Sequence, residues 1–197
     1  MLLKMTKNHS IALVCFFVLT LWPGMASADS HDLEKADKNT IRLVPEAFPQ
    51  LPDPIIRDLK SRRCSIPQPW ESSRPSNVVS GELKVSGQTD WAILCSVKGK
   101  SSVLVYWGAL VDQVEEIPGT QISDRKWIRG VAENKVGFSR LITLTKDGFL
   151  FDHHEYYPQA AINYVNSNGI VGNYSTQAST VHYWHENQWE RMTANDY

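Results

Sequence analysis

The sequence predicts a mainly β (α+β) fold, in which antiparallel β hairpins and a short N-terminal helix form a single domain. Short apolar runs with the alternation of β-strands recur from Asn77 onward, and short polar turns, most of which contain a glycine, separate them. Helical spacing of apolar residues occurs in one short stretch, which follows Asp53-Pro54. A chain of 197 residues is long enough for one domain with a substantial core.

Residues 1–28 have the three parts of a secretory signal peptide. Two lysines give the first part its positive charge, Ile11–Leu21 is an apolar run, and Ala26-Ser27-Ala28 offers small side chains for cleavage. A membrane-spanning helix needs about 20 apolar residues, and this run is roughly half as long. We therefore expect the segment to be removed. The working protein would begin near Asp29, have no transmembrane segment, and be periplasmic or secreted.

The cysteines predict one disulfide bond. Cys15 leaves with the signal peptide, so Cys64 and Cys95 are the only possible pair in the mature chain. A catalytic thiol or a metal site is the alternative. The sequence has no Cys-x-x-Cys motif, and none of its six histidines lies close to either cysteine in sequence. We therefore favour a structural bridge.

The charge of the mature chain bears on its partners. Loss of Lys4 and Lys7 leaves 18 cationic against 21 anionic residues, a formal net charge of −3. We find no basic cluster in the sequence, so we expect no nucleic-acid partner. A protein or a component of the cell envelope is the expected partner.

The mature chain is predicted to begin with a polar segment and a helix. Residues 29–40 contain Leu33 as their only large apolar residue, so we expect a flexible leader before a domain at 41–197. Asp53-Pro54 is typical of a helix start, with the aspartate as the N-cap and the proline as the first helical residue. This helix is predicted to end just before Cys64.

Three strands are predicted after the helix, within Val78–Val85, Trp91–Val97 and Val103–Trp107. Turns that contain glycine separate them, as in hairpins. The central run is apolar on both faces, which favours an inner strand covered on both sides. A Cys64–Cys95 bond would then fasten the end of the helix to the middle of this sheet.

Two further hairpins are predicted, each with a short polar turn between two apolar runs. The paired runs are Phe138–Leu144 with Phe149–Phe151, and Thr180–Trp184 with Trp189–Met192. Residues 158–177 are rich in Asn, Gly, Ser and Tyr. We expect a long loop there, and such a loop is a candidate functional surface. Residues 109–127 fit no clear element.

The segment Val79–Ile93 resembles the FG-GAP/VCBS-type repeat of integrin α-like proteins. Gly81, Gly87, Asp90 and the apolar strand after them stand where that repeat has its glycines, its last loop aspartate and its strand. The resemblance implies a strand–turn–strand shape over this segment. An exported chain with a helix, one degenerate repeat and a terminal Trp-rich hairpin is also similar to bacterial secreted proteins.

In that family the acidic loop positions bind calcium, and they correspond here to Glu82, Lys84, Ser86 and Asp90. Calcium requires several oxygen ligands that together carry negative charge. Lys84 would place an ammonium group beside the ion, and Ser86 removes another carboxylate. We therefore expect no calcium at this loop, and no other cofactor.

The candidate metal ligands are His153, His154, His182 and His185, since zinc and copper favour imidazole and carboxylate groups. Alternation along a strand sends His182 and His185 to opposite faces, and the adjacent pair has the same problem if extended. A zinc site would need one histidine from each segment. We therefore favour surface or hairpin-packing histidines.

Aromatic residues offer a second candidate site. Aromatic faces beside Asn and Gln amides suit sugars or peptides as ligands. The candidate binding residues are Tyr156, Tyr157, Tyr174, Trp184 and Trp189. Aromatic residues at alternating strand positions more often form cross-strand pairs in a core, and we favour that interpretation.

No motif in the sequence assigns an enzymatic activity. The segment around Ser139 lacks the second glycine of a serine-hydrolase elbow, and the sequence has no phosphate loop, dinucleotide fingerprint or zinc-protease motif. We therefore expect an exported, non-enzymatic binding or envelope-associated module. The alternative is a small exported hydrolase or metal-dependent enzyme with a dispersed site of His and carboxylate groups.

Overall fold

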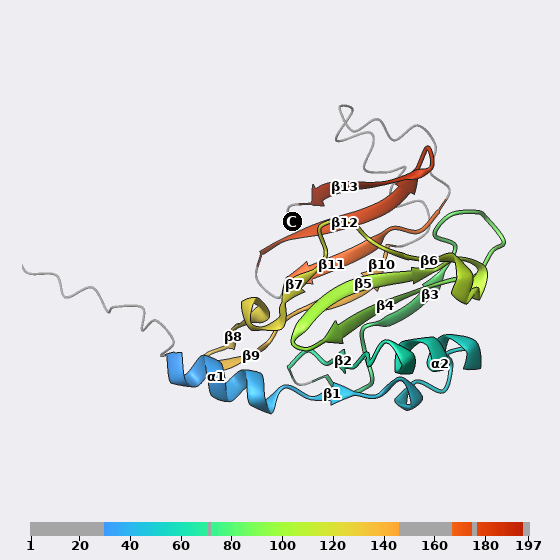
Figure 1. Cartoon of the computed structure of the whole chain (residues 1–197). Helices are drawn as coiled ribbons and strands as arrows, with labels where there is room; N and C mark the ends of the chain where they lie inside the picture. Colours follow the sequence, from blue (N-terminus) through green and yellow to red (C-terminus); the bar gives the residue numbers. More distant parts are fainter. Residues whose placement is uncertain (1–29, 71, 146–166, 175–176, 195–197) are drawn as a thin grey trace, which may run out of the picture.

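A computed structural model describes residues 30–70, 72–145, 167–174 and 177–194. The described part is mainly β with antiparallel sheets, as the sequence predicts (Figure 1). A central sheet has the strand order β3-β4-β5-β6, and β7 pairs with the start of β5. Its strands are β3 (Val78–Gly81), β4 (Asp90–Val97), β5 (Lys100–Tyr106), β6 (Val114–Glu116) and β7 (Ile122–Ser123).

The apolar run of β4 makes it the inner strand of this sheet, which confirms the prediction. β4 lies between β3 and β5, and each of its residues except the last is buried. Alternate side chains enter two separate cores, so Ala92 and Leu94 pack on one face and Ile93 on the other. The β4–β5 turn places Lys98 and Gly99 at φ values of 52° and 73°. Two positive φ values in a row characterise a type I′ hairpin turn.

One face of the central sheet is covered by residues 42–67, and we call it the disulfide face. β1 (Arg42–Leu43) pairs with β2 (Ile66–Pro67), and a 3₁₀ turn at Pro45–Ala47 leads to α2 (Asp53–Ser61). Figure 1 shows β1, β2 and α2 together on this side. The apolar side of α2 is buried here against β4 and β5.

The predicted disulfide between Cys64 and Cys95 is present, with the two Cα atoms 5.4 Å apart. It joins the residue three positions after α2 to the middle of β4. The start of α2 differs from the prediction. Pro52 is the N-cap and Asp53 already lies inside the helix, with no side-chain cap hydrogen bond. The helix begins one residue early because Pro52 is extended, with φ −58° and ψ 138°, and Asp53 takes the first helical position.

The opposite face of the central sheet is covered by two further sheets, and we call it the tryptophan face. One is a ribbon of β8 (Ile128–Ala132) and β9 (Lys135–Phe138). The other has the order β10-β11-β12-β13 and lies on the far side of the central sheet from α2 (Figure 1). Its strands are β10 (Leu141–Leu144), β11 (Ile170–Tyr174), β12 (Gln177–His185) and β13 (Gln188–Ala194).

The predicted C-terminal hairpin is confirmed. β12 and β13 pair in the register that places Trp184 opposite Trp189. Glu186 and Asn187 form the turn between them, with φ values of 46° and 63°. This is again the type I′ pattern, which matches the right-handed twist of the flanking strands.

The other predicted C-terminal hairpin is wrong where the structure describes it. Phe138–Leu144 is not one strand: it divides between β9 and β10, which belong to different sheets. The division falls at Ser139 and Arg140, whose buried side chains bond to neighbouring backbone carbonyls. β10 pairs with β11, whereas the predicted partner Phe149–Phe151 lies outside the described residues.

Three other predicted boundaries change. Where the sequence predicts a flexible leader at 29–40, α1 (Ser30–Asn39) is a helix whose Leu33 and Ala36 pack on the tryptophan-face core. Within 158–177, β11 is a strand rather than a loop. The first predicted strand ends early, at Gly81, and the chain then forms a loop to Asp90.

The stretch 109–127 is built from short pieces rather than long elements. Two 3₁₀ turns come first, β6 and β7 follow them, and a third 3₁₀ turn follows β7. The turns are Trp107–Ala109, Val111–Gln113 and Asp124–Trp127. No helix in the described part of the chain is long and apolar enough to cross a membrane.

Candidate ligand-binding cleft

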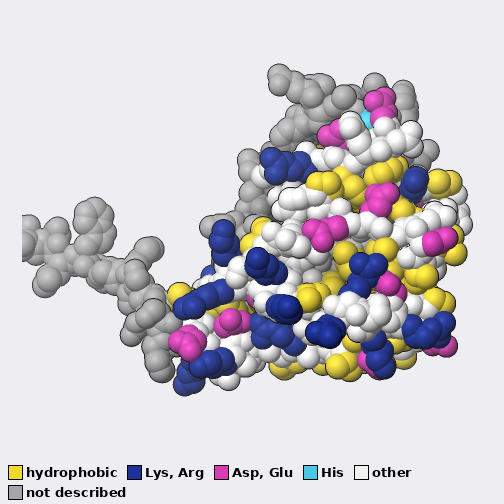
Figure 2. Space-filling model, viewed as in Figure 1, with side chains coloured by type: hydrophobic (Ala, Val, Ile, Leu, Met, Phe, Trp, Pro, Cys, Tyr) yellow, Lys and Arg dark blue, Asp and Glu magenta, His cyan; other side chains and the backbone are white. Residues whose placement is uncertain are grey.

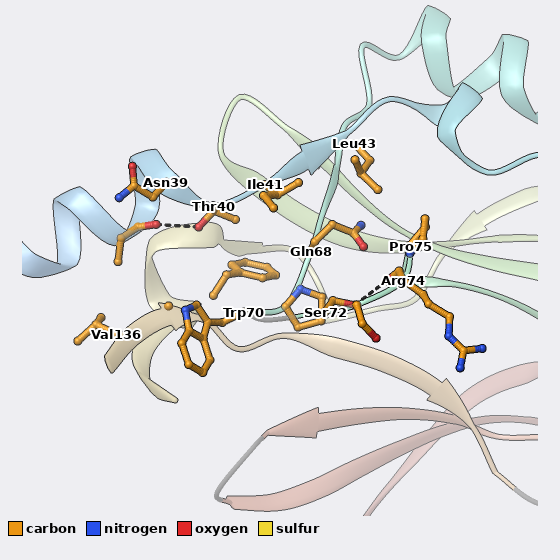
Figure 3. Close-up of a pocket in the computed structure, with 15 residues that line it drawn as sticks. Asn39, Thr40, Ile41, Leu43, Gln68, Trp70, Ser72, Arg74, Pro75 and Val136 are labelled. Atoms are coloured by element: carbon orange, nitrogen blue, oxygen red, sulfur yellow. Dashed lines mark hydrogen bonds between the residues drawn. The ribbon is translucent and has the colours of Figure 1, made fainter. Parts of the chain in front are cut away.

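A cleft of about 560 Å³ lies between the end of α1, β1, the segment after β2, and β9 (Figure 3). Its walls come from three parts of the chain that are far apart in sequence. The lining residues are 36, 39–41 and 43 on the first part, 68–70 and 72–75 on the second, and 136–138 on the third.

Trp70 forms one wall of the cleft, and β9 holds it there. Its backbone N–H donates to the carbonyl of Phe138, the last residue of β9, at 2.8 Å. Gly137 lies directly beneath the indole: a Cβ atom at this position would be only 2.7 Å from Cβ of Trp70. The missing side chain of Gly137 therefore allows Trp70 to approach the strand closely.

The polar side chains around the cleft are mostly committed to the protein itself. The amide of Gln68 donates to the carbonyls of Ile66 and Ser76 and accepts from the backbone N–H of Ser76 at 2.7 Å. Ser72 Oγ donates to the carbonyl of Arg74 at 2.6 Å. These bonds fix the conformation of the second wall, residues 68–70 and 72–75. They leave mainly apolar surface for a ligand.

The rim of the cleft combines apolar exposure with one charge. Ile41 is 64% exposed at the rim, and Val44 nearby is also exposed. Arg74 is exposed on the second wall and forms no ion pair within the described residues. A ligand that places an apolar group against Ile41 and Trp70 and an anionic group near Arg74 would complement this surface.

Sequence reasoning did not identify this cleft. The residues that line it are neither periodic nor close together in sequence. One local signal was Pro67-Gln68-Pro69-Trp70, in which two prolines keep the chain extended beside an aromatic side chain. The first wall was missed because residues 29–40 were interpreted as a leader.

Trp184 and Trp189, two of the predicted binding residues, are part of a packed cluster with Trp107. The ring of Trp107 lies 5.0 Å from that of Trp184 and 5.4 Å from that of Trp189. Lys84 Nζ lies 4.9 Å from the ring centre of Trp184. Both hairpin tryptophans are half-buried on the tryptophan-face core, so packing is the role that their contacts support.

The predicted tyrosines are placed only in part. Tyr156 and Tyr157 lie outside the described residues. Tyr174 is the last residue of β11, and only its backbone is among the described parts of the chain. A shared aromatic platform of these tyrosines with Trp184 and Trp189 therefore stays a prediction.

The predicted histidines are also placed only in part. His153 and His154 lie outside the described residues, and alternation along β12 puts His182 and His185 on opposite faces. His182 lines a cavity of about 190 Å³ beside Arg140 and Arg191. Burial, reinforced by these two arginines, lowers the pKa of His182 to about 4. Within the described residues, no group of three or more His, Cys, Asp or Glu side chains is placed to hold a metal ion.

The loop that resembles a calcium-binding repeat is organised around Asp90. This carboxylate is fully buried and accepts four hydrogen bonds. The donors are the backbone N–H groups of Leu83, Lys84 and Gly108 at 3.1, 3.1 and 2.7 Å, and Gln88 Nε2 at 2.6 Å. Protein donors thus surround the one aspartate that keeps its place in the motif.

The geometry defines a disulfide-bonded, mainly β domain with an apolar cleft between its first helix and a two-stranded ribbon. Comparison with protein-family models, with curated protein sequences and with solved structures finds no match to this chain. The FG-GAP/VCBS-type resemblance stays a prediction.

Proposed function

We propose that the protein is an exported, non-enzymatic binding module that holds a protein segment in the cleft beside Trp70. Two features support export to the periplasm or beyond the cell. The first is the signal-like segment 1–28. The second is the Cys64–Cys95 bond, since disulfides persist mainly in oxidising compartments.

The exposed apolar rim carries the proposal. Ile41 is 64% exposed beside a cleft whose wall includes Trp70 and whose floor includes the buried Phe138. Exposed apolar surface that adjoins an apolar cavity is typical of a ligand or protein contact. The volume of about 560 Å³ lies within the range of clefts that bury small ligands or a few side chains.

The lining also favours binding over hydrolysis. The described residues of the cleft include no His, Cys, Asp or Glu. General acid–base or metal chemistry would need such groups within hydrogen-bond reach of a ligand. The lining instead offers aromatic and aliphatic contacts and the cation of Arg74. These suit a protein segment that has a large apolar side chain close to a carboxylate.

The test uses peptides selected from a random library against the mature chain, residues 29–197. We expect selected peptides to combine large apolar with acidic residues. Ile41→Ser should weaken their binding at least tenfold, because a buried isoleucine contributes about 1.5–3 kcal/mol. Isothermal titration would measure the change.

Leu110→Ser is the matched control, because Leu110 is 48% exposed but lies outside the cleft. This variant should bind the selected peptides as the unmodified chain does. An equal loss of affinity in both variants would contradict the cleft as the binding site. Unchanged affinity of the selected peptides for Ile41→Ser would contradict it too.

A further inference from the structure

Five exposed cations come together on one face of the protein, although three separate turns supply them. We call Arg63, Lys98, Lys100, Arg125 and Lys126 the basic patch. All five side chains are exposed. Figure 2 shows Lys and Arg side chains gathered on the face that carries α1 and the turn between β4 and β5. The sequence was interpreted as having no basic cluster, and folding changes that.

Backbone pairing brings the three turns together. Lys100 pairs with Ser123, and the N–H of Asp124 donates to the carbonyl of Gly99 at 2.8 Å. The β4–β5 turn therefore lies against the 3₁₀ turn that carries Arg125 and Lys126. On the other side, Ser65 and Ser96 exchange two backbone hydrogen bonds of 2.9 and 2.8 Å. This pairing places Arg63, two residues before Ser65, beside the end of β4.

The charges of the patch are not neutralised within the described protein. None of the five side chains forms an ion pair there. The nearest carboxylate in sequence, Asp124, is 1% exposed and turns inward. It accepts from Ser96 Oγ at 2.6 Å and from Arg42 at 3.4 Å. The neighbouring Arg62 is different, because it pairs with Asp58.

We infer that the basic patch adsorbs the protein to a surface of anionic phospholipid headgroups. None of the five patch residues lines the cleft beside Trp70 or the cavity beside His182. Neither of these pockets would therefore hold a small anion against the patch. Several exposed cations on adjacent turns can face a membrane surface at the same time. The phosphates of anionic headgroups at that surface attract each nearby Lys or Arg. An exported protein works next to such a plane at the cell envelope.

The patch lacks the features that favour a nucleic acid. Non-specific binding of single strands combines cations with exposed aromatic rings on which bases stack. The aromatic residue next to the patch, Trp127, is buried. Attraction between the exposed cations and lipid phosphates, with no ring stacking and no apolar insertion, is screened by salt. Binding to the membrane should therefore depend strongly on the salt concentration. This inference is independent of the cleft, and it requires only that the protein meets the envelope.

The test is co-sedimentation of the mature chain with vesicles. One set contains phosphatidylcholine alone, and the other contains equal parts of phosphatidylcholine and phosphatidylglycerol. We expect binding to the mixed vesicles only, and its loss when salt rises from about 0.1 M to about 1 M, which shortens the screening length from about 10 to about 3 Å. Absence of binding to mixed vesicles at low salt would overturn the inference.

Matched double variants locate the site. Lys98→Gln with Lys126→Gln should lower the partition coefficient roughly 25-fold, about fivefold for each cation. Arg57→Gln with Arg191→Gln removes the same charge from exposed positions on α2 and β13 and should change it much less. Equal losses would assign the effect to net charge and overturn the patch. Tighter binding to a single-stranded oligonucleotide than to vesicles would overturn the lipid as its partner.

Ile41→Ser separates this inference from the proposed function. It should bind the mixed vesicles as the unmodified chain does, because Ile41 is not part of the patch. All the substituted side chains are exposed, so the circular-dichroism spectra of the variants should stay unchanged.

Discussion

The two faces of the central sheet are held by different kinds of interaction. On the disulfide face, a covalent bond and a helix fasten residues that are near in sequence, between β1 and β5. On the tryptophan face, the indole rings of Trp184 and Trp189 join β12 and β13 to Trp107, which follows β5 and is far from the hairpin in sequence. The first face is closed by local connections, and the second depends on side-chain packing between distant segments.

This difference has a consequence for folding. Closing short loops costs less chain entropy than pairing distant segments, so the disulfide face can form from the N-terminal half alone. The sheet β10–β13 docks through Trp107, which is 3% exposed, and through the half-buried pair Trp184 and Trp189. Substitutions on the two faces should therefore lower the free energy of unfolding by different amounts.

The largest effect is expected from Trp107→Ala. Removing this ring takes away the aromatic partner that Trp184 and Trp189 share and leaves a cavity, so the free energy of unfolding should fall by about 3–5 kcal/mol. Urea unfolding followed by circular dichroism would measure it. Trp70→Ala is the comparison, because Trp70 is only half-buried, and it should cost clearly less. An equal cost at both positions would contradict a special role for the tryptophan face.

The disulfide face is tested by Cys64→Ser with Cys95→Ser. The bond closes a loop between residues 31 positions apart, which the chain-entropy model values at about 3–4 kcal/mol. Thermal unfolding with and without a reductant would measure the loss. Reductant should lower the midpoint of the unmodified chain and leave the double variant unchanged. A response of the variant to reductant would show that the effect has another source.

Features made by neighbouring residues could be predicted from the sequence. The unbroken apolar run predicted β4, the turn at Glu186-Asn187 lay within the predicted C-terminal hairpin, and two mature cysteines left one pairing. Arg140 shows where this reasoning fails. The apolar run around it predicts one strand that continues through this charged residue. Its buried guanidinium instead bonds Ser101 and Thr120 and ends the run there.

The cleft and the basic patch could not be predicted for a related reason. Each unites segments that no local pattern connects, and their proximity follows from sheet pairing. Trp70 reaches the cleft because its N–H pairs with β9, and Lys100 meets Arg125 and Lys126 because β5 pairs with β7. Besides Pro67-Gln68-Pro69-Trp70, the spacing of Leu33 and Ala36 in α1 is a local signal, because it matches one face of a helix. The high polarity of 29–40 concealed it.

A smaller effect is expected where α2 is fastened by hydrogen bonding. The buried hydroxyl of Tyr106 donates to Asp58 Oδ2 at 2.7 Å, and Arg62 donates to the same oxygen at 2.6 Å. Burial, followed by this bond to Asp58, raises the pKa of Tyr106. Tyr106→Phe should lower the free energy of unfolding by about 2 kcal/mol, since a bond to a charged group is lost. Urea unfolding at neutral pH would measure it, and a neutral effect would show that solvent replaces the bond.

The smallest effect is pH-dependent and concerns the tryptophan face. The pKa of His182 is about 4 in the folded protein, below the value of about 6.5 expected when unfolded. Between these values the unfolded chain binds the extra proton, so stability is complete above about pH 6.5 and falls as the pH falls toward 4. The loss from this group should be about 1.5 kcal/mol near pH 5.5. His182→Gln should remove that part of the pH dependence in urea unfolding, whereas His185→Gln, on the other face of β12, should not remove it. A similar change in both variants would indicate that burial beside Arg140 and Arg191 is not what disfavours the proton.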